Sequence, residues 1–191
     1  MAGLFFLAGL LALSLWAFFD SKKRKFEKFV QQATEGDRNS QYELAQKYEF
    51  GWEVAQDGKE AIKWYKLAAE AFSEAEYRIG RIYYEGRGGI EVDYVEAANW
   101  FRKSAERGSV FGMHGLGLML LTGQGVSLDE AEAVKLFNSS AEKGFSVAQL
   151  CLGMIYLYGK HGVPQDVCVA KEWFQKAANQ GVAMAQFFLG D

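Results

Sequence analysis

The chain has 191 residues, half of them apolar and 15% aromatic, and a net charge of −3. This composition excludes a largely disordered chain, because it supplies enough apolar surface for a buried core. It also argues against a nucleic-acid-binding protein, which would carry a general basic footprint. A single proline, together with abundant Ala, Glu and Lys, favours helices throughout.

Residues 2–19 form an apolar segment with no charge and one polar side chain, Ser14. As a helix it would span about 27 Å, close to the hydrocarbon core of a bilayer. A cleaved signal peptide is disfavoured, because no Lys or Arg precedes the segment and bulky residues (WAFF, 16–19) end it. We therefore predict a transmembrane anchor over residues 1–20, with a buried core helix as the remaining alternative.

A basic cluster follows the apolar segment directly: Lys22, Lys23, Arg24 and Lys25. We expect these side chains to lie at the lipid surface, within a juxtamembrane segment and leading helix over residues 21–36. The positive-inside rule then predicts a single-pass membrane protein with its N-terminus outside and the rest in the cytoplasm. The alternative is an uncleaved signal with a periplasmic domain.

The remaining sequence repeats with a period of about 36 residues. A small residue follows an aliphatic one at intervals of 35, 37, 36 and 37 residues, at Ala45, Gly80, Gly117, Gly153 and Gly190. Each of the first four precedes a glycine by six residues, and an aspartate comes six or seven residues after that glycine: Asp57, Asp93, Asp129 and Asp166. An alanine and then Trp64, Trp100, Leu136 or Trp173 follow at constant spacing.

Each period predicts a pair of antiparallel helices. Glycine is the usual helix stop, and an aspartate is a strong N-cap for the second helix. The small residue allows a neighbouring helix to approach closely, and the aromatic side chains fill the space between layers. One pair cannot bury its apolar face alone, so the pairs must stack into a solenoid. The predicted repeats are 37–71, 72–108, 109–144 and 145–181, with a partial fifth repeat at 182–191.

The pattern L-G-x-x-Y-x-x-G, followed by D-x-x-x-A-x-x-W-F-x-K-A-A-x-x-G, resembles the Sel-one-like repeat (SLR) family, relatives of the tetratricopeptide repeats. Residues 148–181 match it best, and the resemblance covers about residues 28–190. It implies an all-α fold, a right-handed α-solenoid, here preceded by one transmembrane helix. The departures are Ala45 in place of the first glycine, and Leu120 and Leu136 where aromatic residues are expected.

No constellation of catalytic side chains accompanies this pattern. His114 stands where the first two repeats have tyrosine, which predicts a packing role, and His161 lies in a loop where we expect it to be solvated. Cys151 and Cys168 lie at different heights on antiparallel helices, an axial offset of about 7 Å added to an interhelical distance of about 8–10 Å, so we expect no disulfide. We predict a protein that is not an enzyme and has no metal, cofactor or small-molecule substrate.

In the tetratricopeptide relatives the first helix of each pair lines the concave face of the solenoid. The repeat pattern does not specify the residues along one face of these helices, and these positions form a row. The row is mostly polar or charged in the first two repeats, at Glu43, Gln46, Phe50, Arg78, Arg81 and Glu85. It becomes apolar further on, and we predict a partner-binding site at Gly115, Leu118, Thr122, Cys151, Met154, Tyr158 and Phe188. The alternative is that curvature buries this face against neighbouring repeats.

The sequence therefore predicts a protein–protein interaction scaffold. We expect an accessory or assembly subunit whose protein partners include an integral membrane complex, docked on the concave helix face. The alternative is a signalling or regulatory adaptor that recruits a soluble enzyme to the membrane.

Overall fold

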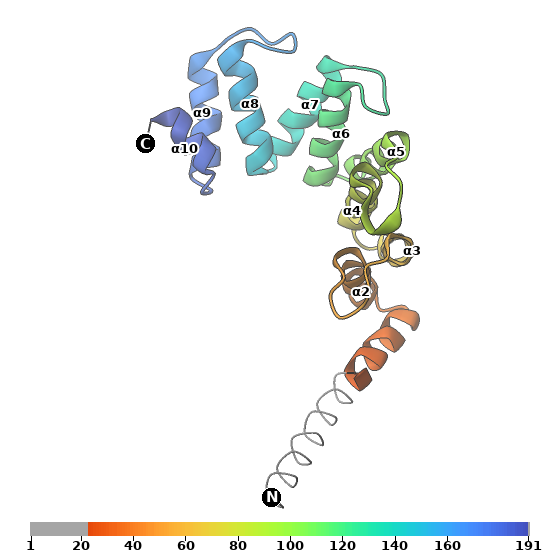
Figure 1. Ribbon diagram of the computed structural model, residues 1–191. Helices are drawn as coiled ribbons and strands as arrows, with labels where there is room; N and C mark the ends of the chain where they lie inside the picture. Colours follow the sequence, from red (N-terminus) through yellow and green to blue (C-terminus); the bar gives the residue numbers. More distant parts are fainter. Residues whose placement is uncertain (1–22, 191) are drawn as a thin grey trace, which may run out of the picture.

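The computed structural model describes residues 23–190, which form helices joined by turns and contain no strand. A leading helix occupies residues 23–34. Helices then alternate in direction along an extended array (Figure 1). They are α2 (Arg38–Phe50), α3 (Gly58–Ala68), α4 (Ser73–Glu85), the short 3-10 helix η1 (Arg87–Gly89), α5 (Tyr94–Glu106), α6 (Val110–Thr122), α7 (Glu130–Glu142), α8 (Ser146–Tyr158), α9 (Val167–Ala178) and α10 (Ala183–Leu189). The all-α array of helix–turn–helix repeats is confirmed.

The predicted helix ends are confirmed both at the capping aspartates and at the glycines that end the first helix of each repeat. The carboxylates of Asp57, Asp93, Asp129 and Asp166 accept backbone N–H bonds of 2.9–3.1 Å at the starts of α3, α5, α7 and α9. The glycines that end α2, α4, α6 and α8 have φ between 60° and 74°, a conformation that costs glycine least. These local signals therefore set the length of each helix.

The small residue of each first helix provides the space for an aromatic ring. A Cβ atom at Gly153 in α8 would lie 2.4 Å from the ring of Phe174 in α9. The same arrangement recurs in two other repeats, where Gly80 lies against Phe101 and Gly117 against Phe137. The predicted close approach is confirmed, and its partner is a ring from the second helix of the same repeat.

This packing predicts that Gly153→Ala destabilises the protein. The added methyl group must displace the ring of Phe174, which is buried and stacks on Phe188. We expect the free energy of unfolding to fall by about 1–3 kcal/mol, although alanine is the better helix former by about 1 kcal/mol. Urea unfolding measures the difference. A variant as stable as the parent would contradict the proposed role of the glycine.

Two further sequence predictions concern the cysteines and the membrane. Cys151, partly buried, and Cys168, exposed, are both free cysteines in the structure. Within residues 23–190, no helix is both long and apolar enough to cross a bilayer. The predicted anchor over residues 1–20 and the side chain of Lys22 lie outside the described residues. Lys23, Arg24 and Lys25 are exposed on the leading helix.

Candidate functional site

The charged, N-terminal part of the first-helix row contacts a buried ion network through Arg78. The side chain of Glu49, at the end of α2, is fully buried. Its carboxylate accepts a hydrogen bond of 2.6 Å from the hydroxyl of Tyr65 and one of 3.0 Å from Nη1 of Arg87. The guanidinium of Arg78 lies 3.9 Å away. These charges join the first two repeats to each other, because a buried charge requires such partners.

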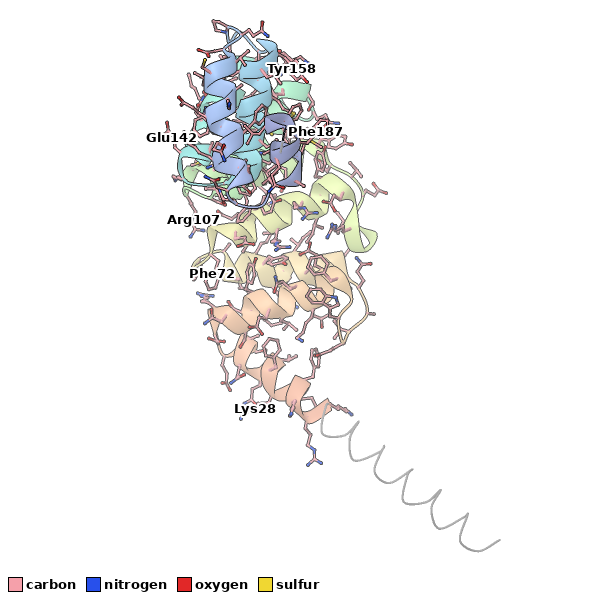
Figure 2. The ribbon with its side chains drawn as sticks, turned by 90° about the vertical axis from the view of Figure 1, so that its left-hand side faces the viewer. Lys28, Phe72, Arg107, Glu142, Tyr158 and Phe187 are labelled. Carbon is pink, nitrogen blue, oxygen red and sulfur yellow. The ribbon has the colours of Figure 1, made fainter. Side chains whose placement is uncertain are left out.

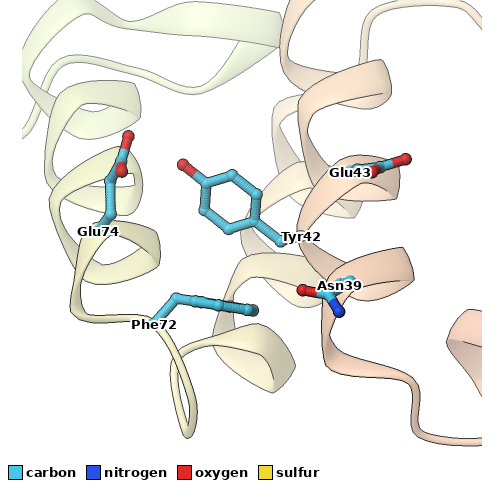
Figure 3. A pocket seen from close by; sticks show the side chains of 5 residues that line it. All are labelled: Asn39, Tyr42, Glu43, Phe72 and Glu74. Carbon is cyan, nitrogen blue, oxygen red and sulfur yellow. The ribbon is translucent and has the colours of Figure 1, made fainter.

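A small pocket remains between α2 and α4 in this charged part (Figure 3). Tyr42 extends from α2 between Glu74 and Phe72, and its ring centroid lies 5.6 Å from that of Phe72. Burial raises the pKa of Tyr42 to about 12. The pocket holds about 220 Å³, below the roughly 300–1,000 Å³ typical of small-molecule sites. We therefore assign it to the contact between repeats.

The C-terminal part of the row carries an apolar groove of about 250 Å³ between α6 and α8. Its floor is the fully buried ring of Phe137 from α7, and its rim includes Leu118 and Tyr158, which are 44% and 55% exposed. Among the described residues, the lining consists of Leu118, Leu121, Phe137, Cys151, Met154, Ile155, Tyr158, Lys160 and His161. Side chains of a protein partner fit such a surface better than a whole small molecule does.

The structure brings together four of the seven residues in the predicted partner-binding site: Leu118, Cys151, Met154 and Tyr158. Gly115 lies instead between α4 and α6, next to the ring of Phe101. Thr122 is exposed at the end of α6, where its hydroxyl donates to the carbonyl of Leu118 at 3.0 Å.

Phe188, the last residue of the predicted row, does not line this groove. Its ring stacks on Phe174 with centroids 4.8 Å apart, and it lines a separate cleft beside α9. The neighbouring Phe187 of α10 is 76% exposed. Phe187 and Tyr158 both lie at the end of the array far from Lys28 on the leading helix (Figure 2).

Sequence reasoning missed the polar rim of the groove. His161, expected to be solvated, has its Nδ1 atom 2.8 Å from Oε1 of Glu130 at the start of α7. The two residues lie 31 positions apart, and no local pattern links them. Lys160 lies beside His161, with its ammonium 5.4 Å from the ring centroid of Tyr158.

The packing role of His114 is confirmed. Its ring lies between Phe137 and Phe145, with both centroid distances 5.4 Å. Burial lowers the pKa of His114 to about 4, and its Nδ1 atom has no hydrogen-bond partner. Burial also raises the pKa of the Cys151 thiol to about 11. A thiol that stays protonated at neutral pH is a poor nucleophile. Among residues 23–190, no cluster of three or more His, Cys, Asp or Glu residues is able to hold a metal ion.

Each match to a known family model contains one of the helix pairs described above. The model of the Sel1 repeat matches residues 38–71, 73–109, 110–145 and 146–182. The chain belongs to the Sel1 repeat family. Its four Sel1 repeats contain α2–α3, α4–α5, α6–α7 and α8–α9.

Two solved Sel1 repeat structures resemble this chain in amino-acid sequence as well as in fold. A protective antigen of uropathogenic Escherichia coli strains that displays an SLR fold is 37% identical, with a TM-score of 0.78. The match covers 86% of this chain and 35% of that one. A Sel1 repeat protein from Oxalobacter formigenes is 36% identical, with a TM-score of 0.73 over 81% of this chain and 63% of that one.

Curated relatives include cytochrome c oxidase assembly factor 7 of Xenopus tropicalis, 33% identical over 114 residues. The match covers 57% of this chain and 49% of the relative. Cytochrome c oxidase assembly factor 7A of Xenopus laevis is 32% identical over the same shares of the two chains. The chain thus spans about half the length of the curated relatives it matches, and this homology is distant.

Proposed function

We propose that this Sel1 repeat protein is a non-enzymatic scaffold that docks a partner protein in the apolar groove between α6 and α8. The observation that carries the proposal is the exposure of Leu118 and Tyr158 above the buried ring of Phe137. Exposed apolar surface that forms a groove favours an interaction site. An amphipathic helix is the partner segment that fits such a groove, because its apolar face presents side chains at regular spacing.

The partner that we propose is an integral membrane complex, with this protein as an accessory or assembly subunit. Two observations support this choice. The distant relatives carry the name of an assembly factor for cytochrome c oxidase. The apolar residues 2–19 and the basic cluster after them also favour a membrane anchor, with the repeats on the cytoplasmic side.

Charged substitutions at the groove rim test the docking site. We expect Leu118→Asp combined with Tyr158→Asp to reduce co-purification of the membrane partner at least tenfold, because an aspartate loses its hydration in an apolar interface. Both side chains are exposed, so the unfolding temperature should change little. The measurement is the stoichiometry of partner protein in full-length chain purified from membranes in mild detergent.

The matched control is Leu128→Asp combined with Val167→Asp, at exposed apolar positions outside the groove, 62% and 57% exposed. It should retain the partner. Equal loss in both variants would contradict docking in the groove, and unfolding of the first variant would show that the row is core. Partners that are soluble and substoichiometric would favour the regulatory adaptor instead. Deletion of residues 1–20 should release the protein from membranes if they anchor it.

A further inference from the structure

A further cleft lies between the leading helix and α2. These two helices lie at the end of the array opposite α8, α9 and α10 (Figure 1). Its volume of about 690 Å³ falls within the range of roughly 300–1,000 Å³ for small-molecule sites. Three lysines line it, Lys23 and Lys25 from the leading helix and Lys47 from α2. Positive charge therefore reaches this cleft from two separate helices.

Lys47 differs from an ordinary surface lysine because its position is fixed. Its side chain is only 20% exposed, compared with 74% for Lys23. Its ammonium donates to Oε2 of Glu53 at 2.8 Å and lies 5.6 Å from the ring centroid of Phe29. An ammonium has three donors, of which the bond to Glu53 uses one. Lys47 is thus a preorganised cation at the side of the cleft.

Apolar side chains provide the rest of the surface. Phe26 and Phe29 line the cleft and pack partly against the core of the first repeat. A cleft that combines ammonium groups with aromatic rings matches an amphiphile that has an anionic head and apolar chains. A free inorganic anion would leave the rings without a partner.

The charge of the lining limits the charge of the ligand. Glu43 and Glu53 also line the cleft, so among residues 23–190 its three lysines and two glutamates contribute a net charge of +1. This balance favours a singly charged phosphodiester over a polyphosphate or a nucleic acid, which would meet the two carboxylates unfavourably.

We propose that this cleft binds the phosphate headgroup of an anionic phospholipid such as phosphatidylglycerol. The inference rests on the membrane attachment proposed above. In the sequence, the leading helix follows the apolar residues 2–19 and the basic cluster almost at once, so the cleft lies close to the proposed bilayer surface. Occupation by a headgroup would hold the first repeat, through Lys47, in a defined orientation to the membrane.

The test is native mass spectrometry of the full-length chain in detergent with added phosphatidylglycerol or phosphatidylcholine. We expect wild type to bind phosphatidylglycerol more tightly than phosphatidylcholine. Lys47→Gln should weaken phosphatidylglycerol binding about fivefold, the effect of one lysine near an anionic lipid, and leave phosphatidylcholine binding unchanged.

Lys63→Gln is the matched control. Lys63 also pairs with a glutamate, Glu60 at 3.0 Å, and its ammonium lies 5.4 Å from the ring centroid of Trp64. It belongs to α3 and is not part of the cleft, so this variant should bind phosphatidylglycerol as wild type does. Equal affinity of wild type for the two lipids, or equal losses in the two variants, would overturn the headgroup site.

Two further measurements separate the sources of failure. Millimolar inorganic phosphate should displace phosphatidylglycerol poorly; if it competes as well as the lipid does, a free phosphate is the ligand and the lipid assignment is wrong. Flotation of wild type with phosphatidylcholine vesicles tests membrane attachment independently of the cleft. Failure to float would contradict the proposed attachment, whereas flotation with no effect of Lys47→Gln on phosphatidylglycerol binding would contradict the headgroup site alone.

Discussion

Replacing Phe137 with alanine is expected to lower the free energy of unfolding by about 3–5 kcal/mol. The ring is fully buried, lies against Gly117 and forms the floor of the apolar groove. Alanine would lose the transfer free energy of the ring and leave a cavity that the rigid helices around it cannot fill. Because a domain is stable by only about 5–15 kcal/mol, this one change removes a large share of the total.

Phe187→Ala makes the same chemical change at a position that is 76% exposed. It should alter stability by less than about 0.5 kcal/mol. Urea unfolding followed by circular dichroism measures both variants on the same scale. If the two substitutions cost the same, the ring of Phe137 does not have the packing role that we assign to it.

Acidification is the second large effect that we expect, and it acts through His114. Burial between aromatic rings lowers the pKa of His114 to about 4, from an ordinary value of 6.5. Below pH 6.5 the unfolded chain therefore binds a proton that the folded chain does not bind until about pH 4. Stability is fully present above pH 6.5 and is lost as the pH falls to about 4, by on the order of 3 kcal/mol.

His114→Tyr isolates this contribution, because the corresponding positions of the first two repeats, Tyr42 and Tyr77, already hold tyrosine. Carboxylates elsewhere titrate equally in both proteins, so they cancel in the difference. The difference in unfolding free energy between variant and wild type should grow as the pH falls from 7 to 4, then level off. A constant difference across this range would show that His114 is not held neutral by burial.

The repeats could be predicted from sequence because their signals are local. An aspartate such as Asp93 caps a helix through its own carboxylate and the next backbone N–H groups, and a glycine such as Gly86 ends one through its own φ. Neither effect depends on the rest of the chain. The small size of Gly153 likewise predicted a close approach, which the ring of Phe174 makes.

The groove could be predicted only in part. Helical spacing puts Cys151, Met154 and Tyr158 on one face of α8, and that face does line the groove with Leu118. Phe188, which continues the row in sequence, lies outside the groove because its ring stacks on Phe174 of the preceding helix. Periodicity describes the face of a single helix, but it does not say which face the next helix covers.

The sequence by itself determined where each helix begins and ends, how the helices pair, and that the first-helix row turns from charged to apolar along the chain. The tertiary structure alone decided which of those side chains stay exposed, and which distant residues meet. It placed His161 beside Glu130 and the ammonium of Lys47 over the ring of Phe29. The physical reason is that capping and propensity act within a few residues, whereas exposure depends on the rotation between successive repeats, which results from the packing of all the side chains between them.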